Sequence, residues 1–150
     1  MRVVWNDSYE GTFISLYLYR LKVPELPVRR LQTLYLAHNE LASIPAEMAS
    51  NLTSLHYLDL SANDLTVVPL ITHTLPELKT FNIADNPITA VSNTSFLGIA
   101  DSLEELDIRR LSLMTFEVSF QLRDKISKQS NIKLSLTDYF YSPIISIYDN

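Results

Sequence analysis

The sequence predicts an α/β solenoid, a chain wound into short repeated turns in which one strand from each turn joins a parallel sheet. Three observations support this prediction: an apolar pattern that recurs along the chain, a nearly constant distance between its copies, and an asparagine at one fixed place in the pattern. The 150 residues are 47% apolar and 19% charged, which is typical of an ordered domain.

The recurring pattern is Leu-x-x-Leu-x-Leu-x-x-Asn-x-Leu, which is the sequence signature of leucine-rich repeats. Three copies are complete, and a fourth keeps the apolar frame but has Leu111 in place of the asparagine. The copies are separated by 24, 23 and 25 residues, within the range of about 20 to 29 residues for this repeat class. They begin at Leu31, Leu55, Leu78 and Leu103.

Two less regular copies flank these four. Residues 13–18 supply the apolar frame of the first, and residues 134–139 supply that of the last. We therefore predict a repeat domain over residues 13–144 in about five to six copies, clearest over 31–116. Residues 1–12 and 145–150 are then the flanks. In the first irregular copy, Leu16 and Leu18 are equivalent to Leu34 and Leu36, and no asparagine stands at the position of Asn39. In the last copy, the equivalents of Leu34, Leu36 and Asn39 are Leu134, Leu136 and Tyr139.

The centre of each copy predicts a short strand, because leucines that alternate with polar residues point to one side of a sheet. The strands are expected to form the parallel concave side of a right-handed horseshoe arc. The asparagines are expected to be structural, with side-chain amides that satisfy backbone groups in the turn after each strand. This predicted asparagine ladder consists of Asn39, Asn63 and Asn86.

The second half of each copy is expected to return over the convex side of the arc. In residues 44–55 and 115–126 the apolar spacing favours a helical turn or short helix, whereas residues 70–78 look more irregular. The predicted convex side is therefore a mixture of helical and irregular segments.

The outward positions of the predicted strands form the candidate partner-binding face. Aromatic residues dominate its N-terminal half and acidic residues its middle, and exposed tyrosine and arginine are favoured at protein interfaces. The alternative is a sheet face that only contacts solvent. The candidate binding residues are Tyr17, Tyr35, Tyr57, Asp59, Asn82, Glu105, Asp107 and Arg109.

Composition argues against several other functions. The net charge is -5 with only 12 lysines and arginines, so a basic face for nucleic acid is not expected. There is no cysteine, and the three histidines, His38, His56 and His73, do not form a metal-ligand pattern. We therefore expect no metal, no cofactor, no small-molecule substrate and no enzymatic activity.

The chain also contains three acceptor patterns for asparagine-linked glycans, at Asn6, Asn51 and Asn93. No signal peptide is recognised at the N-terminus, and no apolar run approaches the roughly 20 residues of a membrane-spanning helix. Contact with a membrane is therefore expected only through parts of a parent protein absent from this chain.

Two stretches add a resemblance to a known family. They are FLGIADSLEELDIRRLSLMTFE at residues 96–117 and LSLTDYFYSPII at residues 134–145. In these stretches the chain resembles extracellular animal leucine-rich-repeat proteins, and most of all the chaoptin-type adhesion proteins of insects. The resemblance implies that the chain is a fragment of a long adhesion protein located outside the cell or at its surface.

The main hypothesis is thus a protein-binding repeat module of a cell-adhesion or receptor-type ectodomain, which uses its concave sheet face. The partner is a protein, and a second copy of the same protein is one option. Two alternatives remain open: a structural spacer within a longer solenoid that binds nothing itself, or an intracellular or bacterial-effector type of leucine-rich-repeat binder.

Overall fold

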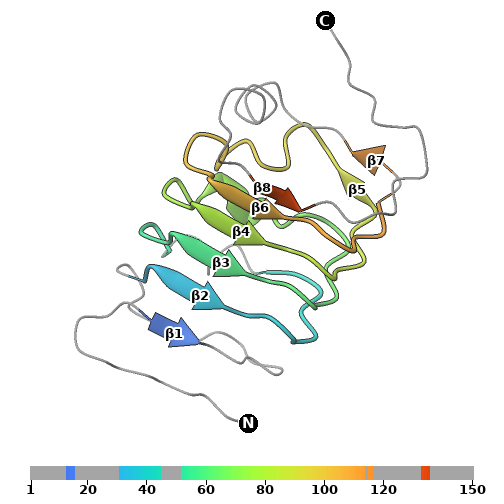
Figure 1. Ribbon diagram of the computed structural model, residues 1–150, viewed down its shortest axis with the longest axis horizontal. Coiled ribbons are helices and arrows are strands. Elements are labelled where there is room, and N and C mark those ends of the chain that lie inside the picture. The colour runs from blue at the N-terminus through green and yellow to red at the C-terminus, as the bar shows by residue number, and fades with distance from the viewer. Residues whose placement is uncertain (1–12, 16–30, 45–51, 114, 117–132, 136–150) are drawn as a thin grey trace, which may run out of the picture.

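The computed structural model describes residues 13–15, 31–44, 52–113, 115–116 and 133–135 of the chain. Within these residues six short strands form one parallel sheet in the order β1-β2-β3-β4-β6-β8, with one strand from each repeat (Figure 1). The predicted leucine-rich-repeat solenoid is confirmed. The strands are β1 (Phe13–Ser15), β2 (Thr33–Tyr35), β3 (Tyr57–Asp59), β4 (Thr80–Asn82), β6 (Glu105–Asp107) and β8 (Lys133–Ser135).

The core lies behind this sheet, because in β2, β3, β4 and β6 the middle residue points inward and its two neighbours point outward. Leu58, Phe81 and Leu106 are completely buried at the centres of β3, β4 and β6. The register aligns these central residues across the sheet, so each repeat adds one apolar layer to the next.

The irregular copy that precedes Leu31 lies in a different register from the one predicted. β1 pairs Ile14 with Leu34 and Ser15 with Tyr35, which is two residues earlier than the predicted frame. A shift of two residues keeps every side chain on the same side of a strand, so the apolar pattern does not distinguish the two registers. Ser15 therefore occupies the position that was assigned to Tyr17, and Tyr17 lies outside the described residues.

The last repeat agrees with the predicted frame. β8 pairs Leu134 with Leu106 and Ser135 with Asp107, so the outward position falls where the pattern placed it. Tyr139, which the pattern places at the asparagine position, lies outside the described residues.

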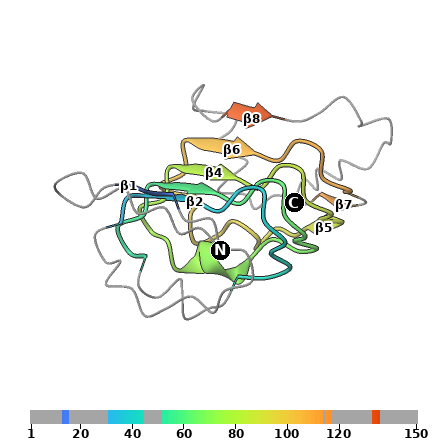
Figure 2. The same ribbon diagram turned by 90° about the horizontal axis from the view of Figure 1, so that it is seen from below.

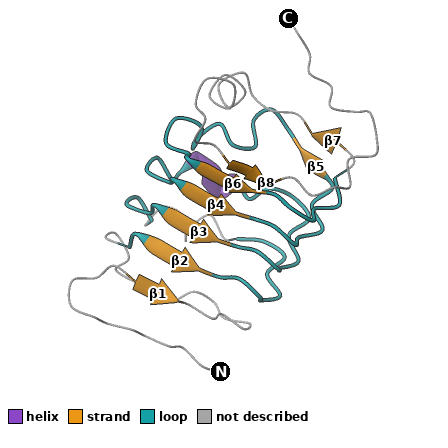
Figure 3. Ribbon diagram, in the orientation of Figure 1, coloured by secondary structure: helices purple, strands orange, loops and turns teal. Residues whose placement is uncertain are grey.

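The return segments lie on the opposite side of the molecule from the sheet (Figures 2 and 3). Residues Leu70–His73 form a short 3-10 helix, η1, within the stretch 70–78 that was expected to be irregular. A second small parallel sheet pairs β5 (Ala90–Val91) with β7 (Thr115–Phe116). Neither element was predicted, and β7 begins the stretch 115–126 that was expected to favour helix.

The asparagines hold the turns that follow the strands. Asn63 Nδ2 donates to the carbonyls of Leu60 and Ser61 in its own repeat and of Leu36 in the preceding one, and its Oδ1 accepts from the Leu41 amide. Asn86 repeats this arrangement one level further along the solenoid. Both side chains are almost completely buried, and each links two repeats.

The residue before each ladder position has a left-handed backbone conformation. The φ angles are 56° at His38, 52° at Ala62, 56° at Asp85 and 53° at Arg110. The first three of these residues donate their amides to carbonyls of the next repeat, at 2.9–3.0 Å. The same turn is therefore built in four successive repeats without glycine, including the repeat in which Leu111 replaces asparagine.

No helix in the described part of the chain is long and apolar enough to cross a membrane.

Candidate partner-binding face

The outward side chains of β2, β3, β4 and β6 form one surface, which we call the sheet face. The register places them in two rows that run across the strands. One row consists of Thr33, Tyr57, Thr80 and Glu105, and the other consists of Tyr35, Asp59, Asn82 and Asp107.

Two tyrosines form the aromatic part of the sheet face. The ring centroids of Tyr35 and Tyr57 are 4.8 Å apart with the rings tilted by 46°, so they pack against each other across β2 and β3. Tyr35 remains 39% exposed. Partial burial, followed by the charge of Asp59, raises the pKa of Tyr57 to about 12, so this phenol is neutral at physiological pH.

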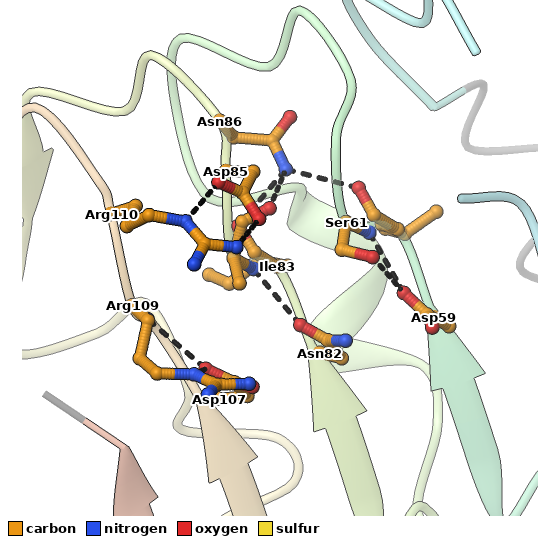
Figure 4. Close-up of polar contacts among 11 residues, drawn as sticks. Asp59, Ser61, Asn82, Ile83, Asp85, Asn86, Asp107, Arg109 and Arg110 are labelled. Carbon is orange, nitrogen blue, oxygen red and sulfur yellow. Dashed lines mark hydrogen bonds and ion pairs between the residues drawn. The ribbon is translucent and has the colours of Figure 1, made fainter. Parts of the chain in front are cut away.

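The polar residues at the ends of three strands cap their own turns (Figure 4). Oδ1 of Asp59 accepts from the Ser61 amide at 2.9 Å, and the equivalent oxygens of Asn82 and Asp107 accept from the amides two residues later. These are side-chain turns of the kind that aspartate and asparagine favour. Asp59 also accepts from the Ser61 hydroxyl at 2.6 Å, so this half-buried carboxylate has a structural role besides its charge.

The two arginines after β6 are both engaged in ion pairs. The Arg109 guanidinium folds back onto the Asp107 carboxylate, with Nη2 2.6 Å from Oδ2. Arg110 reaches one repeat back and pairs with Asp85 through two hydrogen bonds. The hydrogen bond from Arg110 holds the pKa of Asp85 below its usual value. Of the two acidic partners, Asp107 and Asp85, only Asp107 lies on the sheet face.

Two more contacts between a basic and an acidic side chain lie at the opposite ends of the strands. His56 Nε2 is 3.3 Å from Glu77, and Lys79 Nζ is 3.0 Å from Glu104. Lys79 and Glu104 lie in neighbouring repeats, whereas His56 and Glu77 lie at the two ends of the copy that begins at Leu55. One of the three histidines, His56, therefore has an acidic side chain beside it.

Of the three predicted glycosylation positions, one lies within the described residues and two lie outside them. Asn93 is exposed in the return segment after β5, away from the sheet face, whereas Asn6 and Asn51 lie outside the described residues. No group of three or more histidine, cysteine or acidic side chains in the described stretches could hold a metal ion.

One apolar groove was not predicted. It has a volume of about 250 Å³ and lies on the flank between the repeats that begin at Leu31 and Leu55, lined by Ile44, Leu65, Val67, Leu70 and Ile71 among others. Val67 and Leu70 are 64% and 81% exposed. The tyrosine pair and this groove are thus two places where described residues present apolar surface, and Leu97 is a separate exposed apolar side chain.

Known proteins share the repeat and the fold. A family model described as "Leucine Rich repeats (2 copies)" matches residues 29–72. Chaoptin of Drosophila melanogaster is 41% identical over 129 residues and chaoptin of Tribolium castaneum is 46% identical over 96 residues. These alignments cover 84% and 64% of the chain but only 10% and 12% of the relatives, so the chain spans a small part of their length.

A solved structure gives an independent comparison of the fold. The crystal structure of Listeria monocytogenes InlP matches with a TM-score of 0.59 and 26% sequence identity, over 81% of this chain and 31% of that one. Its match agrees with the single parallel sheet and the repeated turns described above. The chain is therefore a run of leucine-rich repeats that folds as a solenoid and is similar in sequence to the insect chaoptins.

Proposed function

We propose that the chain is a protein-binding module of a cell-adhesion or receptor-type ectodomain, and that the sheet face is its recognition surface. The observation that carries this proposal is the Tyr35–Tyr57 pair, two aromatic rings packed together on an open sheet face. Tyrosine offers a large contact area with a polar end, at a small cost in side-chain entropy, and is enriched among the residues that dominate binding energy.

Three further features support the proposal. The repeats supply a rigid scaffold, because each strand is hydrogen-bonded to its neighbours and each turn is tied to the next. The similarity to chaoptins supports a setting outside the cell or at its surface. The described polar contacts serve turns and ion pairs between repeats, which favours binding over catalysis.

The test replaces the tyrosine pair by Tyr35→Thr and Tyr57→Thr, since threonine keeps the strand preference and already occupies positions 33 and 80. The full-length natural protein is displayed on non-adherent cells, and its retention of cells displaying the same protein, or of cells from its own organism, is measured. We expect the affinity of the double variant to fall by about tenfold or more, because the loss of an aromatic anchor typically costs more than 1 kcal/mol of binding free energy.

The matched control is Val67→Thr with Leu70→Thr, which removes two exposed apolar side chains from the groove and none from the sheet face. It should bind as the unaltered protein does. Full binding by the tyrosine variant would overturn the proposal and favour the structural spacer. An unaltered protein that retains neither kind of cell would also contradict it.

We also propose that Asn93 carries a glycan when the protein passes through a secretory pathway. Asn93 is exposed in the tripeptide Asn93-Thr94-Ser95 on a return segment, where a bulky sugar leaves the sheet face open. Expression in insect cells followed by mass spectrometry should find peptides with a glycan at Asn93, and Asn93→Gln should lower the mass by that one glycan. An unmodified Asn93 in secreted protein would contradict this prediction.

A further inference from the structure

Two acidic residues of the sheet face, Asp59 and Glu105, form no ion pair among the described side chains, and the backbone register places Lys133 of β8 next to Glu105. Neither Asp59 nor Glu105 takes part in an ion pair within residues 31–44 and 52–113. In the same stretches every lysine and arginine is already paired: Lys79 with Glu104, Arg109 with Asp107, and Arg110 with Asp85. The basic side chains described in this region are thus held away from the tyrosine pair.

The charges and the rings lie close enough to act together. Asp59 is two residues after Tyr57 on the same face of β3, and the register places it beside Tyr35 on β2. The carboxylates of Asp59 and Glu105 both raise the pKa of Tyr57, so both lie within electrostatic range of its hydroxyl. Two ring systems and two carboxylates therefore share one part of the sheet face.

This combination is suited to one kind of side chain. A guanidinium group is planar and permanently charged, stacks on the face of a tyrosine ring, and donates parallel hydrogen bonds to a carboxylate. We propose that the sheet face binds an extended basic segment of its protein partner, with an arginine seated between the tyrosine pair and Asp59. This inference rests on the proposed function and specifies the chemistry of the partner.

The spacing of the acids adds a second requirement. Asp59 on β3 and Glu105 on β6 are separated by two strand spacings across the sheet and by two residues along the strands, so their backbone positions lie roughly 12 Å apart. In an extended peptide the side chains alternate between two faces, so positions i and i+4 lie on one face and are about 13 Å apart. An extended segment can therefore place arginines at positions i and i+4 over the two carboxylates.

The experiment measures binding of the whole 150-residue chain to synthetic probes by fluorescence anisotropy. The probes are seven-residue labelled peptides of serine and glycine with two arginines at positions i and i+4. Matched peptides carry citrulline, which keeps the shape but not the charge, or lysine, which keeps the charge but not the plane. We expect the citrulline peptide to bind about tenfold more weakly, and the lysine peptide to fall between the two.

The variant arm uses Asp59→Asn with Glu105→Gln. Asparagine keeps the oxygen that caps Ser61, so the double variant should fold, which its circular dichroism checks. Its affinity for the arginine peptide should fall by about fivefold or more, and that affinity should depend less on salt concentration. The control Asp64→Asn removes one negative charge, against two in the double variant, from an exposed position outside the two rows of the sheet face and should change binding by less than about twofold.

The outcomes separate this inference from the proposed function. Equal binding of the arginine and citrulline peptides, or unchanged binding by the Asp59→Asn and Glu105→Gln variant, would overturn the arginine site. If that variant retained full cell binding while the tyrosine variant lost it, recognition by the sheet face would stand and the basic partner would be wrong.

Discussion

Replacing Asn63 by alanine should lower the free energy of unfolding by roughly 3 kcal/mol, because it removes four hydrogen bonds at a buried site and takes from the Leu41 amide its described acceptor. The Asn63 amide donates at 2.8 Å to Leu36, 2.9 Å to Leu60 and 3.1 Å to Ser61, and its oxygen accepts from Leu41 at 3.1 Å. Its side chain is only 5% exposed, so water replaces these bonds poorly. Urea denaturation of the chain followed by circular dichroism would measure the loss.

Asn39 provides a matched control at the same position of the preceding repeat. It is half-buried, and its described bonds reach only the Leu36 and Ala37 carbonyls of its own turn, at 3.0 and 3.1 Å. Asn39→Ala should therefore cost only about 1 kcal/mol. If both variants lost less than about 0.5 kcal/mol, the ladder would contribute far less to stability than its geometry indicates.

The fourth repeat shows that the turn persists without this amide. Leu111 occupies the ladder position, yet Arg110 before it keeps the left-handed conformation. The ion pair between Arg110 and Asp85 links this turn to the preceding one. The two residues are 25 apart, which equals the step between the third and fourth copies, so the repeat period contained a signal for their contact.

The sequence predicted the sheet because its evidence is periodic. Leu34, Leu58, Phe81 and Leu106 recur at regular steps and alternate with outward residues, so both the strands and their alignment follow from the pattern. The register of β1 did not follow from the pattern, because a two-residue shift preserves the direction of every side chain. The strands β5 and β7 have two residues each, too few for any alternation to appear.

The sheet face was predictable in its position but not in its contacts. Alternation placed Tyr35 and Tyr57 on one side of neighbouring strands, where their rings now lie 4.8 Å apart. The turn-capping bonds of Asp59 were missed, although aspartate followed two residues later by a strand-ending turn is a recognised local signal. The folding of Arg109 onto Asp107 depends on side-chain conformation, which the repeat pattern does not determine.

Gly98 marks a close approach between two return segments. A methyl group added at Gly98 would lie 2.4 Å from the Cα atom of His73 and 2.5 Å from the Thr72 carbonyl oxygen. Both are backbone atoms of the preceding repeat, and they cannot turn aside as a side chain can. The hydroxyl of buried Thr72 also donates to the Ser95 carbonyl at 2.7 Å, which fixes the two segments side by side.

We therefore expect Gly98→Ala to lower the free energy of unfolding by roughly 3 kcal/mol, at the upper end of the usual cost of overpacking. The physical reason is that one repeat must move away from the next, which opens the apolar layer between them. Asn93→Ala lies in the same return segment at an exposed position and should stay within about 0.5 kcal/mol of the unaltered chain. Urea denaturation of both variants would decide the question: equal stabilities would mean that the two segments are not in backbone contact at Gly98.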